Sequence, residues 1–256
     1  MSDTLKRAPF RLGPFIPRNY ANAPIVEAII SLNVELPPTF EVEQLRSFHT
    51  SISADYSPSG EEQTVNITPI PAAVIPPGNT SGFRFASQDG RYVVACRANS
   101  FTLSRLPPYD NWEAFQAEAQ RLWVLYTARY EPVRVTGLSV RYVNRIEIPH
   151  EKDQFMDFRW YLRTFPEVSS DLDIGLSGFI MRLDIPLKEI NAHLILNEAM
   201  LPGSPSSKTI SLLLDTDIVS RFDGEGDMWE RLGSLRQAKN NVFEACMTNL
   251  TRELFT

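Results

Sequence analysis

The sequence of 256 residues predicts an α+β protein made of two related halves, each with the order strand, helix, three strands, helix. Three observations support this fold class: strand-like alternation of apolar and polar residues, helical spacing of apolar residues in two long segments, and residue patterns that occur twice. We expect a largely antiparallel sheet with the long helices packed on one face. The predicted parts are an irregular N-terminal arm (1–20), a first half (21–132) and a second half (133–256).

The first half is expected to begin with a strand after Pro24. Its apolar positions alternate with polar ones such as Glu27 and Ser31, which is the period of a strand. These apolar residues are Val26, Ala28, Ile30, Leu32, Val34 and Leu36. A short helix over 40–53 follows, and residues 57–81 form a Pro-, Gly- and Ser-rich excursion that includes an optional short strand over 63–70.

A hairpin, a third strand and a helix complete the first half. Strands over 82–87 and 92–98 are joined by Asp89-Gly90, a dipeptide typical of tight hairpin turns. The third strand covers 101–106. Asp110 is then expected to cap a helix with one apolar face. That face carries Trp112, Phe115, Ala119, Leu122 and Tyr126.

The second half is expected to repeat this order. A long strand over 134–148 ends at Pro149, and a short helix is placed over 153–165. The remaining elements are strands near 172–185, 191–200 and 208–220, followed by a helix over about 227–254.

Matching residues support the duplication. Val34-Glu-Leu-Pro and Ile146-Glu-Ile-Pro each end the first strand of a half. Ser104-Arg-Leu and Ser220-Arg-Phe each close the last strand before the long helix, and both helices begin near a Trp-Glu pair. Since these matches occur in the same order, they favour a common framework.

Composition narrows the class of protein. The formal net charge of −6 at pH 7 disfavours broad binding to a phosphate backbone, which needs clustered Lys and Arg. We expect a cytoplasmic protein with no membrane partner, because the sequence has no apolar leader and no membrane-spanning run. Cys96 and Cys246 lie far apart in apolar segments, which favours two buried thiols over reactive ones and excludes a paired zinc motif.

Catalytic and metal-binding motifs are not found. His49, His150 and His193 do not have metal-ligand spacing, so no metal site is predicted. Asp215 and Asp217 share one strand face, and a solvated face is favoured over a cation site because the matched positions in the first half are not acidic. No phosphate-binding loop, nucleophile elbow or kinase signature occurs. The sequence favours a non-catalytic protein over an enzyme and predicts no cofactor.

Arg141-Tyr-Val-Asn-Arg145 is the segment that least resembles ordinary architecture. On a strand, Arg141 and Arg145 share one face, while Tyr142 and Asn144 share the other. Paired guanidinium groups can bind a carboxylate or phosphate, so Arg141, Asn144 and Arg145 are candidate anion- or partner-binding residues. The alternative is a structural ion pair of Glu27 with Arg141 or Arg145.

Arg105, Tyr109 and Arg221 are the other candidate anion- or partner-binding residues. Arg105 and Arg221 occupy matched positions just before the long helices, where an anion is favoured by the helix N-terminus. The alternative for each is an ion pair, with Asp110 or Asp223. Tyr109 is either the aromatic rim of a groove or a turn residue packed on Trp112.

The chain resembles a sporadically distributed family of bacterial proteins of similar length with no assigned activity. The resemblance spans nearly the whole chain. It is carried by Asn22-Ala-Pro-Ile-Val-Glu-Ala28, Ser104-Arg-Leu-Pro-Pro-Tyr109 with Trp112, Arg141-Tyr-Val-Asn-Arg-Ile146, and Phe243 with Leu254-Phe255. Such a patchy distribution implies horizontal transfer, as in defence or toxin–antitoxin gene clusters, and it implies no particular chemistry.

We therefore expect a non-catalytic protein-binding or regulatory subunit, such as an accessory or antitoxin-like component of such a cluster. It would hold a partner protein with its strand edges and with the groove between the halves. The sequence does not decide whether the protein also forms a homodimer. The alternative is a nucleotide or nucleic-acid (phosphate) binding protein that uses Arg105, Arg141, Arg145 and Arg221. The net charge disfavours nucleic acid.

Overall fold

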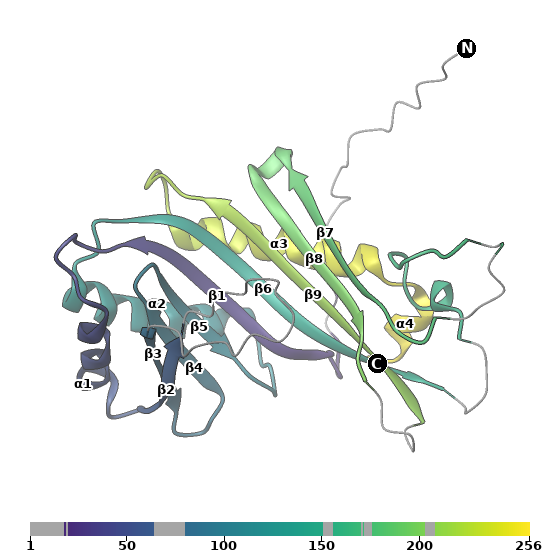
Figure 1. Cartoon of the computed structure of the whole chain (residues 1–256), viewed down its shortest axis with the longest axis horizontal. Coiled ribbons are helices and arrows are strands. Elements are labelled where there is room, and N and C mark those ends of the chain that lie inside the picture. Colours follow the sequence, from purple (N-terminus) through teal and green to yellow (C-terminus); the bar gives the residue numbers. More distant parts are fainter. Residues whose placement is uncertain are drawn as a thin grey trace, which may run out of the picture.

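A single antiparallel sheet of nine strands organises the computed structural model, which describes residues 18, 20–63, 80–150, 156–169, 171, 176–202 and 208–256 (Figure 1). The strand order across the sheet is β2-β3-β4-β5-β1-β6-β9-β8-β7. The strands are β1 (Ile25–Glu35), β2 (Tyr56–Gln63), β3 (Thr80–Ser87), β4 (Tyr92–Arg97), β5 (Ser100–Arg105), β6 (Arg134–Pro149), β7 (Ile180–Leu187), β8 (Ala192–Met200) and β9 (Thr209–Arg221).

Helical segments connect and flank the strands. The α-helices are α1 (His49–Ile52), α2 (Trp112–Tyr130), α3 (Met228–Cys246) and α4 (Asn249–Glu253). The 3-10 segments are η1 (Val42–Phe48), η2 (Phe158–Trp160) and η3 (Lys188–Ile190). α3 packs against β6 and β9, and Figure 1 shows it crossing the strands of the second half.

The two halves meet at the centre of the sheet, where β1 pairs with β6. Ile30 lies opposite Val140, and Leu32 lies opposite Leu138. All four side chains are fully buried, as are Leu103 on β5 and Ile218 on β9. We call the side of the sheet that carries these residues the core face. Because strand side chains alternate, the intervening residues form the opposite, polar face.

Each long helix begins at a side-chain cap. Asn111 caps α2 by accepting a hydrogen bond from the Ala114 N–H at 2.8 Å, so the cap lies one residue after the predicted Asp110. Asp227 caps α3 by accepting from the Trp229 N–H at 2.7 Å. Both caps satisfy N–H groups that have no partner within the helix. They thereby fix where the first turns of α2 and α3 stand beside the sheet.

The predicted fold class is wrong. The structure is one nine-stranded sheet rather than two halves with the same element order, and strand residues outnumber helical ones. Four strands follow the first helical segment of the first half, whereas three follow in the second half. A layer of long helices over one face is not shown. α2 contacts β5, and α3 contacts β6 and β9.

The helix predicted over 153–165 is also wrong within its described part, 156–165, where the 3-10 segment η2 stands instead. Phe158 and Leu162 have helical spacing because both anchor this connection in the core, with exposed fractions of 6% and 2%. Two buried residues of an irregular connection therefore have the same spacing as the apolar face of a helix. Of the optional strand predicted over 63–70, Gln63 ends β2, and 64–70 lies outside the described residues.

The hairpin predicted at Asp89-Gly90 is confirmed. β3 pairs with β4, and Gly90 has a φ angle of 68°, in the left-handed region that glycine adopts without strain. The Asp89 carboxylate accepts hydrogen bonds from the Ser87 hydroxyl at 2.6 Å and from the Arg91 N–H at 3.0 Å. These bonds lower the pKa of Asp89 and hold the turn closed.

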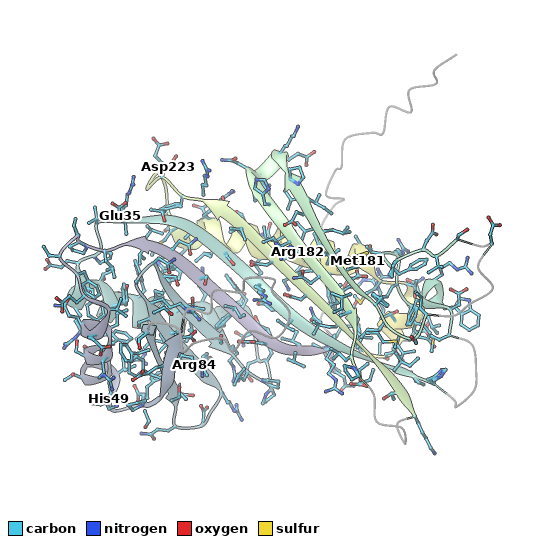
Figure 2. All side chains as sticks on the ribbon, in the orientation of Figure 1. Glu35, His49, Arg84, Met181, Arg182 and Asp223 are labelled. Atoms are coloured by element: carbon cyan, nitrogen blue, oxygen red, sulfur yellow. The ribbon has the colours of Figure 1, made fainter. Side chains whose placement is uncertain are left out.

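The polar face carries side chains that bond across neighbouring strands. Ser31 on β1 bonds Thr102 on β5 at 2.8 Å, and Ser139 on β6 donates to Asp217 on β9 at 2.6 Å. Figure 2 places Arg84 and Arg182 on strands near opposite edges of the sheet. The Ser31–Thr102 and Ser139–Asp217 hydrogen bonds show how polar side chains on this face find partners across neighbouring strands.

Candidate functional site

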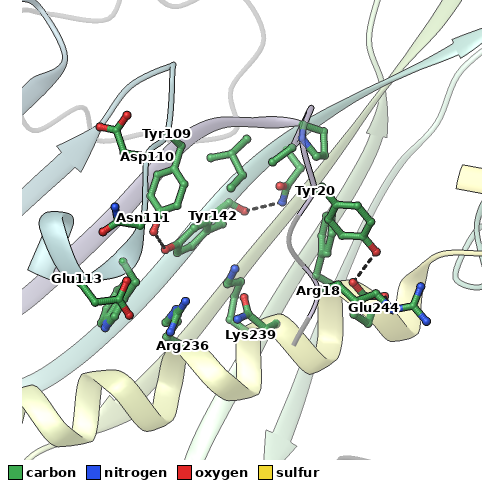
Figure 3. Close-up of a pocket in the computed structure, with 17 residues that line it drawn as sticks. Arg18, Tyr20, Tyr109, Asp110, Asn111, Glu113, Tyr142, Arg236, Lys239 and Glu244 are labelled. Atoms are coloured by element: carbon green, nitrogen blue, oxygen red, sulfur yellow. Dashed lines mark hydrogen bonds and ion pairs between the residues drawn. The ribbon is translucent and has the colours of Figure 1, made fainter. Parts of the chain in front are cut away.

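A cavity of about 430 Å³ lies where the two halves meet. Its walls come from the segment before β1, the first turn of α2, the middle of β6 and one side of α3 (Figure 3). Its polar and charged lining consists of Arg18, Tyr20, Tyr109, Asp110, Asn111, Glu113, Tyr142, Asn144, Arg236, Lys239, Asn240 and Glu244. A volume of this size is typical of a small-molecule site.

Two tyrosines form one wall of the cavity. The hydroxyl groups of Tyr109 and Tyr142 are 2.6 Å apart and share a hydrogen bond, and the rings meet edge to face (Figure 3). Burial raises the pKa of Tyr109 to about 12 and raises that of Tyr142 well above its usual value. Both phenols are therefore neutral near pH 7, and one hydroxyl hydrogen of the pair is available to a ligand.

Lys239 lies opposite this wall, on α3. Only 6% of the residue is exposed, and its Nζ atom is 3.5 Å from the centroid of the Tyr142 ring. Burial, followed by repulsion from Arg236, lowers the pKa of Lys239 to about 7. The ring face attracts an ammonium group by only about 0.5–2 kcal/mol, which offsets part of the desolvation cost.

Some charges around the cavity already have partners. The Asp110 carboxylate accepts a hydrogen bond from Arg105 at 2.5 Å. The Glu244 carboxylate accepts from the Tyr20 hydroxyl at 2.7 Å and from Arg252 at 2.8 Å (Figure 3). These pairs form part of the wall and leave little negative charge for a ligand.

Arg236 and Lys239 remain as basic groups without a carboxylate partner among the described residues. Both side chains project from α3 toward Tyr142 (Figure 3). The Arg236 guanidinium lies 5.5 Å from the centroid of the Trp112 ring. Glu113 lines the opposite side but is exposed at the rim. The two basic groups therefore lie together on the α3 side of the cavity, and the N-terminal end of α2 also favours an anion.

The predicted site residues do not converge. Of the six candidates, Tyr109 and Asn144 line the cavity, whereas Arg105, Arg141, Arg145 and Arg221 do not. Asn144 is 2% exposed and donates to the Leu214 carbonyl at 3.1 Å, which ties β6 to β9. Its side chain therefore acts mainly in the wall.

Arg105 is an interior residue, and the alternative given for it, an ion pair with Asp110, is the interaction that it makes. Only 2% of it is exposed, and it donates to Asp110 and, at 3.0 Å, to the Leu106 carbonyl. Its guanidinium also lies 4.8 Å from the centroid of the Tyr92 ring. Arg105 thus holds the loop before α2 from within the core. The predicted pairing with Asp110 is confirmed.

Arg141 and Arg145 point to the polar face, where carboxylates pair with both. Arg141 makes two hydrogen bonds of 2.8 Å to Asp215, and Arg145 donates to Glu147 at 2.5 Å. The predicted ion pair with Glu27 is not the one formed, since Glu27 makes no ion pair within the described part of the chain. Glu27 on β1 and Asp215 on β9 lie on either side of β6, both opposite Val143, and the Arg141 side chain bonds the β9 carboxylate.

Arg221 ends β9 and is exposed, away from the cavity. Nothing in the ranges that the structure covers pairs with it, Asp223 included. Arg221 is exposed and does not line the cavity, so it does not share a binding site with Tyr109 or Asn144. Its matched partner in the first half, Arg105, has the opposite environment.

Arg236 and Lys239 were missed by sequence reasoning. A signal for Lys239 is present, because it occupies a position in the buried stripe of α3 that also contains Leu232, Leu235 and Val242. A lysine at such a position is almost never fully buried without a partner or a function. Arg236 carries no comparable signal, since it follows a typical surface spacing.

Metal binding finds no support among the described residues, which contain no group of three or more His, Cys, Asp or Glu side chains placed to hold an ion. The Asp215 carboxylate is taken up by Arg141 and by Asn197, and Asp217 accepts from Ser139. Both cysteines are buried, and burial raises the pKa of the Cys96 thiol.

None of the described helices contains an apolar stretch long enough to cross a lipid bilayer. Comparison of the chain with protein-family models and with curated proteins finds no match. The resemblance to a sporadic bacterial family therefore stays a prediction, and the case for function rests on the cavity.

Proposed function

We propose that this protein binds a small molecule with an anionic group, a carboxylate or a phosphate, in the cavity between its halves. The observation that carries the proposal is the Arg236 guanidinium on the wall formed by α3, which has no carboxylate partner among the described residues and lies near the Lys239 amine. Arg236 is half-buried, and a cation partly removed from water without a counter-ion is unfavourable, so an anionic ligand would supply the missing charge. Asn111 and Trp112 at the start of α2 line the same space, where the helix N-terminus favours an anion.

The neutral wall complements this electropositive one. Tyr109 and Tyr142 offer a hydroxyl hydrogen and an aromatic surface, so the ligand is expected to combine an anionic end with a short uncharged part. A cavity of about 430 Å³ suits a small metabolite and is too small for a folded domain. The four predicted arginines play no part in this proposal.

Isothermal titration calorimetry with inorganic phosphate and with acetate tests the proposal. Arg236→Gln is expected to weaken the binding of the better ligand by about 10- to 100-fold, because one charged hydrogen bond contributes about 1.5–3 kcal/mol. Arg129→Gln, an exposed arginine in the last turn of α2, is the matched control and should bind like the wild type. Equal binding by both variants, or no binding by the wild type, contradicts the proposal.

Binding of a partner protein is a second candidate, favoured by exposed apolar residues near one edge of the sheet. Four of the exposed large apolar side chains in the described ranges lie within 160–180: Trp160, Val168, Leu176 and Ile180. Ile180, at 88% exposed, begins β7, the last strand of the sheet. An edge strand beside exposed apolar residues can pair with an added strand.

Affinity capture from the source cells, with mass spectrometry, tests this second candidate. If a partner pairs with β7, Ile180→Glu should abolish its recovery. Val124→Glu, which changes a 63% exposed apolar residue on α2, should leave recovery unchanged. Loss of recovery in both variants, or in neither, would remove β7 as the binding edge.

A further inference from the structure

We propose that Lys239 is a nucleophilic amine that condenses with an aldehyde or ketone group of the anion bound in the cavity, forming an imine. The proposal rests on the proposed function, because the same cavity must hold the ligand. It adds a substrate class: small oxo acids, in which a carbonyl group lies next to a carboxylate.

The position of Lys239 suits this chemistry. Its side chain projects from α3 into the cavity, and its Nζ atom lies over the face of the Tyr142 ring (Figure 3). No carboxylate within the described part of the chain forms an ion pair with it. A ligand that enters the cavity therefore meets an amine that is not occupied by a counter-ion.

The charged and titratable groups around Lys239 favour its neutral form. Arg236, one turn earlier on α3, repels the ammonium, and the phenols of Tyr109 and Tyr142 are neutral. The remaining charged lining consists of Glu244 on α3, Glu113 on α2, Asp110 in the preceding loop and Arg18. Burial, and after it repulsion from Arg236, lowers the pKa of Lys239 to about 7, so a large share of the amine is unprotonated at neutral pH.

Imine formation balances without an oxidant or a reductant. The Nζ lone pair attacks the carbonyl carbon, so a C–N bond forms while the C–O π bond opens. A proton moves from nitrogen to oxygen, and the resulting carbinolamine loses water to give the imine. The Tyr109–Tyr142 pair lies beside Lys239, and its free hydroxyl hydrogen can bond the carbonyl oxygen during the attack.

The separation between Arg236 and Lys239 sets the length of the substrate. Residues three apart on a helix have Cβ atoms about 5–6 Å apart, so both side chains reach one short molecule. If Arg236 holds the carboxylate, the carbonyl group next to it lies within reach of Lys239. A two- or three-carbon oxo acid meets this requirement, whereas a simple aldehyde lacks the group that Arg236 would hold.

Reductive trapping tests the inference with glyoxylate as the probe. The folded wild-type protein is incubated with glyoxylate and sodium cyanoborohydride, digested, and sequenced by mass spectrometry. Lys239 should be carboxymethylated at least tenfold faster than the exposed Lys188, and the rate should rise as the pH increases through about 7. Acetate, which has the carboxylate but no carbonyl, should slow the labelling of Lys239 and not that of Lys188.

Two variants of Lys239 keep the test sharp. Lys239→Met should abolish labelling at this position, and Lys188→Met should leave the labelling of Lys239 unchanged. Lys239→Arg retains a cation but cannot form an imine, so it should still bind acetate. If the methionine variant does not fold, Lys239→Arg replaces it as the variant that cannot be labelled at this position. Folding of each variant is checked by circular dichroism.

The outcomes separate this inference from the proposed function. If glyoxylate binds by calorimetry but Lys239 is labelled no faster than Lys188, the imine is excluded while anion binding stands. If glyoxylate, acetate and phosphate all fail to bind and no selective labelling occurs, both proposals fall. Selective labelling that acetate does not slow would show a reactive amine without an anion site, which overturns the proposed function and this inference with it.

Discussion

Replacing Asp110 by alanine is expected to destabilise the protein by about 3 kcal/mol or more, because it leaves the Arg105 charge unpaired in the interior. Arg105 is 2% exposed and Asp110 is half-exposed, and they are joined at 2.5 Å. The two carbonyl groups that Arg105 also contacts, those of Arg91 and Leu106, cannot neutralise its charge. Chemical denaturation, compared with the wild type at constant pH, measures the loss.

A double-mutant comparison shows whether the buried charge is the cause. Adding Arg105→Met to Asp110→Ala removes that charge and should recover part of the lost stability. Glu35→Ala is the matched control, since its pair with Arg134 has a similar distance of 2.7 Å but both side chains are exposed. The control should change stability by less than about 1 kcal/mol. A double variant less stable than Asp110→Ala would mean that packing by Arg105 dominates.

Replacing Glu198 by methionine is expected to stabilise the protein at alkaline pH. Glu198 is 1% exposed on the core face of β8, and neither carboxylate oxygen has a hydrogen-bond partner among the described residues. Burial raises the pKa of Glu198 to about 8. The variant should gain roughly 2–5 kcal/mol at pH 9, since each pKa unit corresponds to about 1.4 kcal/mol.

The direction of the pH dependence follows from the raised pKa. The protonated carboxyl of Glu198 contributes full stability below the unfolded-state value of about 4.3, and this contribution is lost as the pH rises through about 8. The gain of the variant should therefore be absent at pH 4 and grow between pH 5 and pH 9. Denaturation midpoints across this range measure it.

A control for Glu198 is Glu189→Met, which changes an exposed glutamate on η3. Its stability should differ from the wild type by no more than about 0.5 kcal/mol at either pH. Lys239 titrates in the same range in the wild type and in both variants, so its contribution cancels in the comparison. A constant difference between Glu198→Met and wild type from pH 4 to pH 9 would show that the carboxyl group does not titrate in the core.

Local strand patterns were well predicted because alternation reports which side of a strand is buried. Ile30 on β1 and Val140 on β6 fall where period-2 spacing places them. The order of strands across the sheet was not predictable in this way, since it depends on pairing between distant segments. The helix expected near Phe158 failed for a related reason: two buried anchors of an irregular connection share the spacing of a helical face.

The candidate site was predicted in part. Asn144 was identified from strand geometry and Tyr109 from its place after a proline pair, and both line the cavity. Arg105 was misplaced because arginine is rarely buried, and its burial depends on a carbonyl-rich loop that the sequence does not reveal. Lys239 was overlooked because the sequence shows a charged residue in an apolar stripe of a helix but does not show that it faces Tyr142 on β6.

The pairing of β1 with β6 has a consequence for how the molecule folds. β1 pairs with a strand that begins about a hundred residues later in the chain. Such long-range pairing forms slowly, so we expect the centre of the sheet to form late. The cavity also needs α3, so it is complete only when this helix is docked beside β6 and β9. A ligand of the cavity can thus recognise only the completed molecule, and it would protect finished copies against unfolding without assisting partly folded chains.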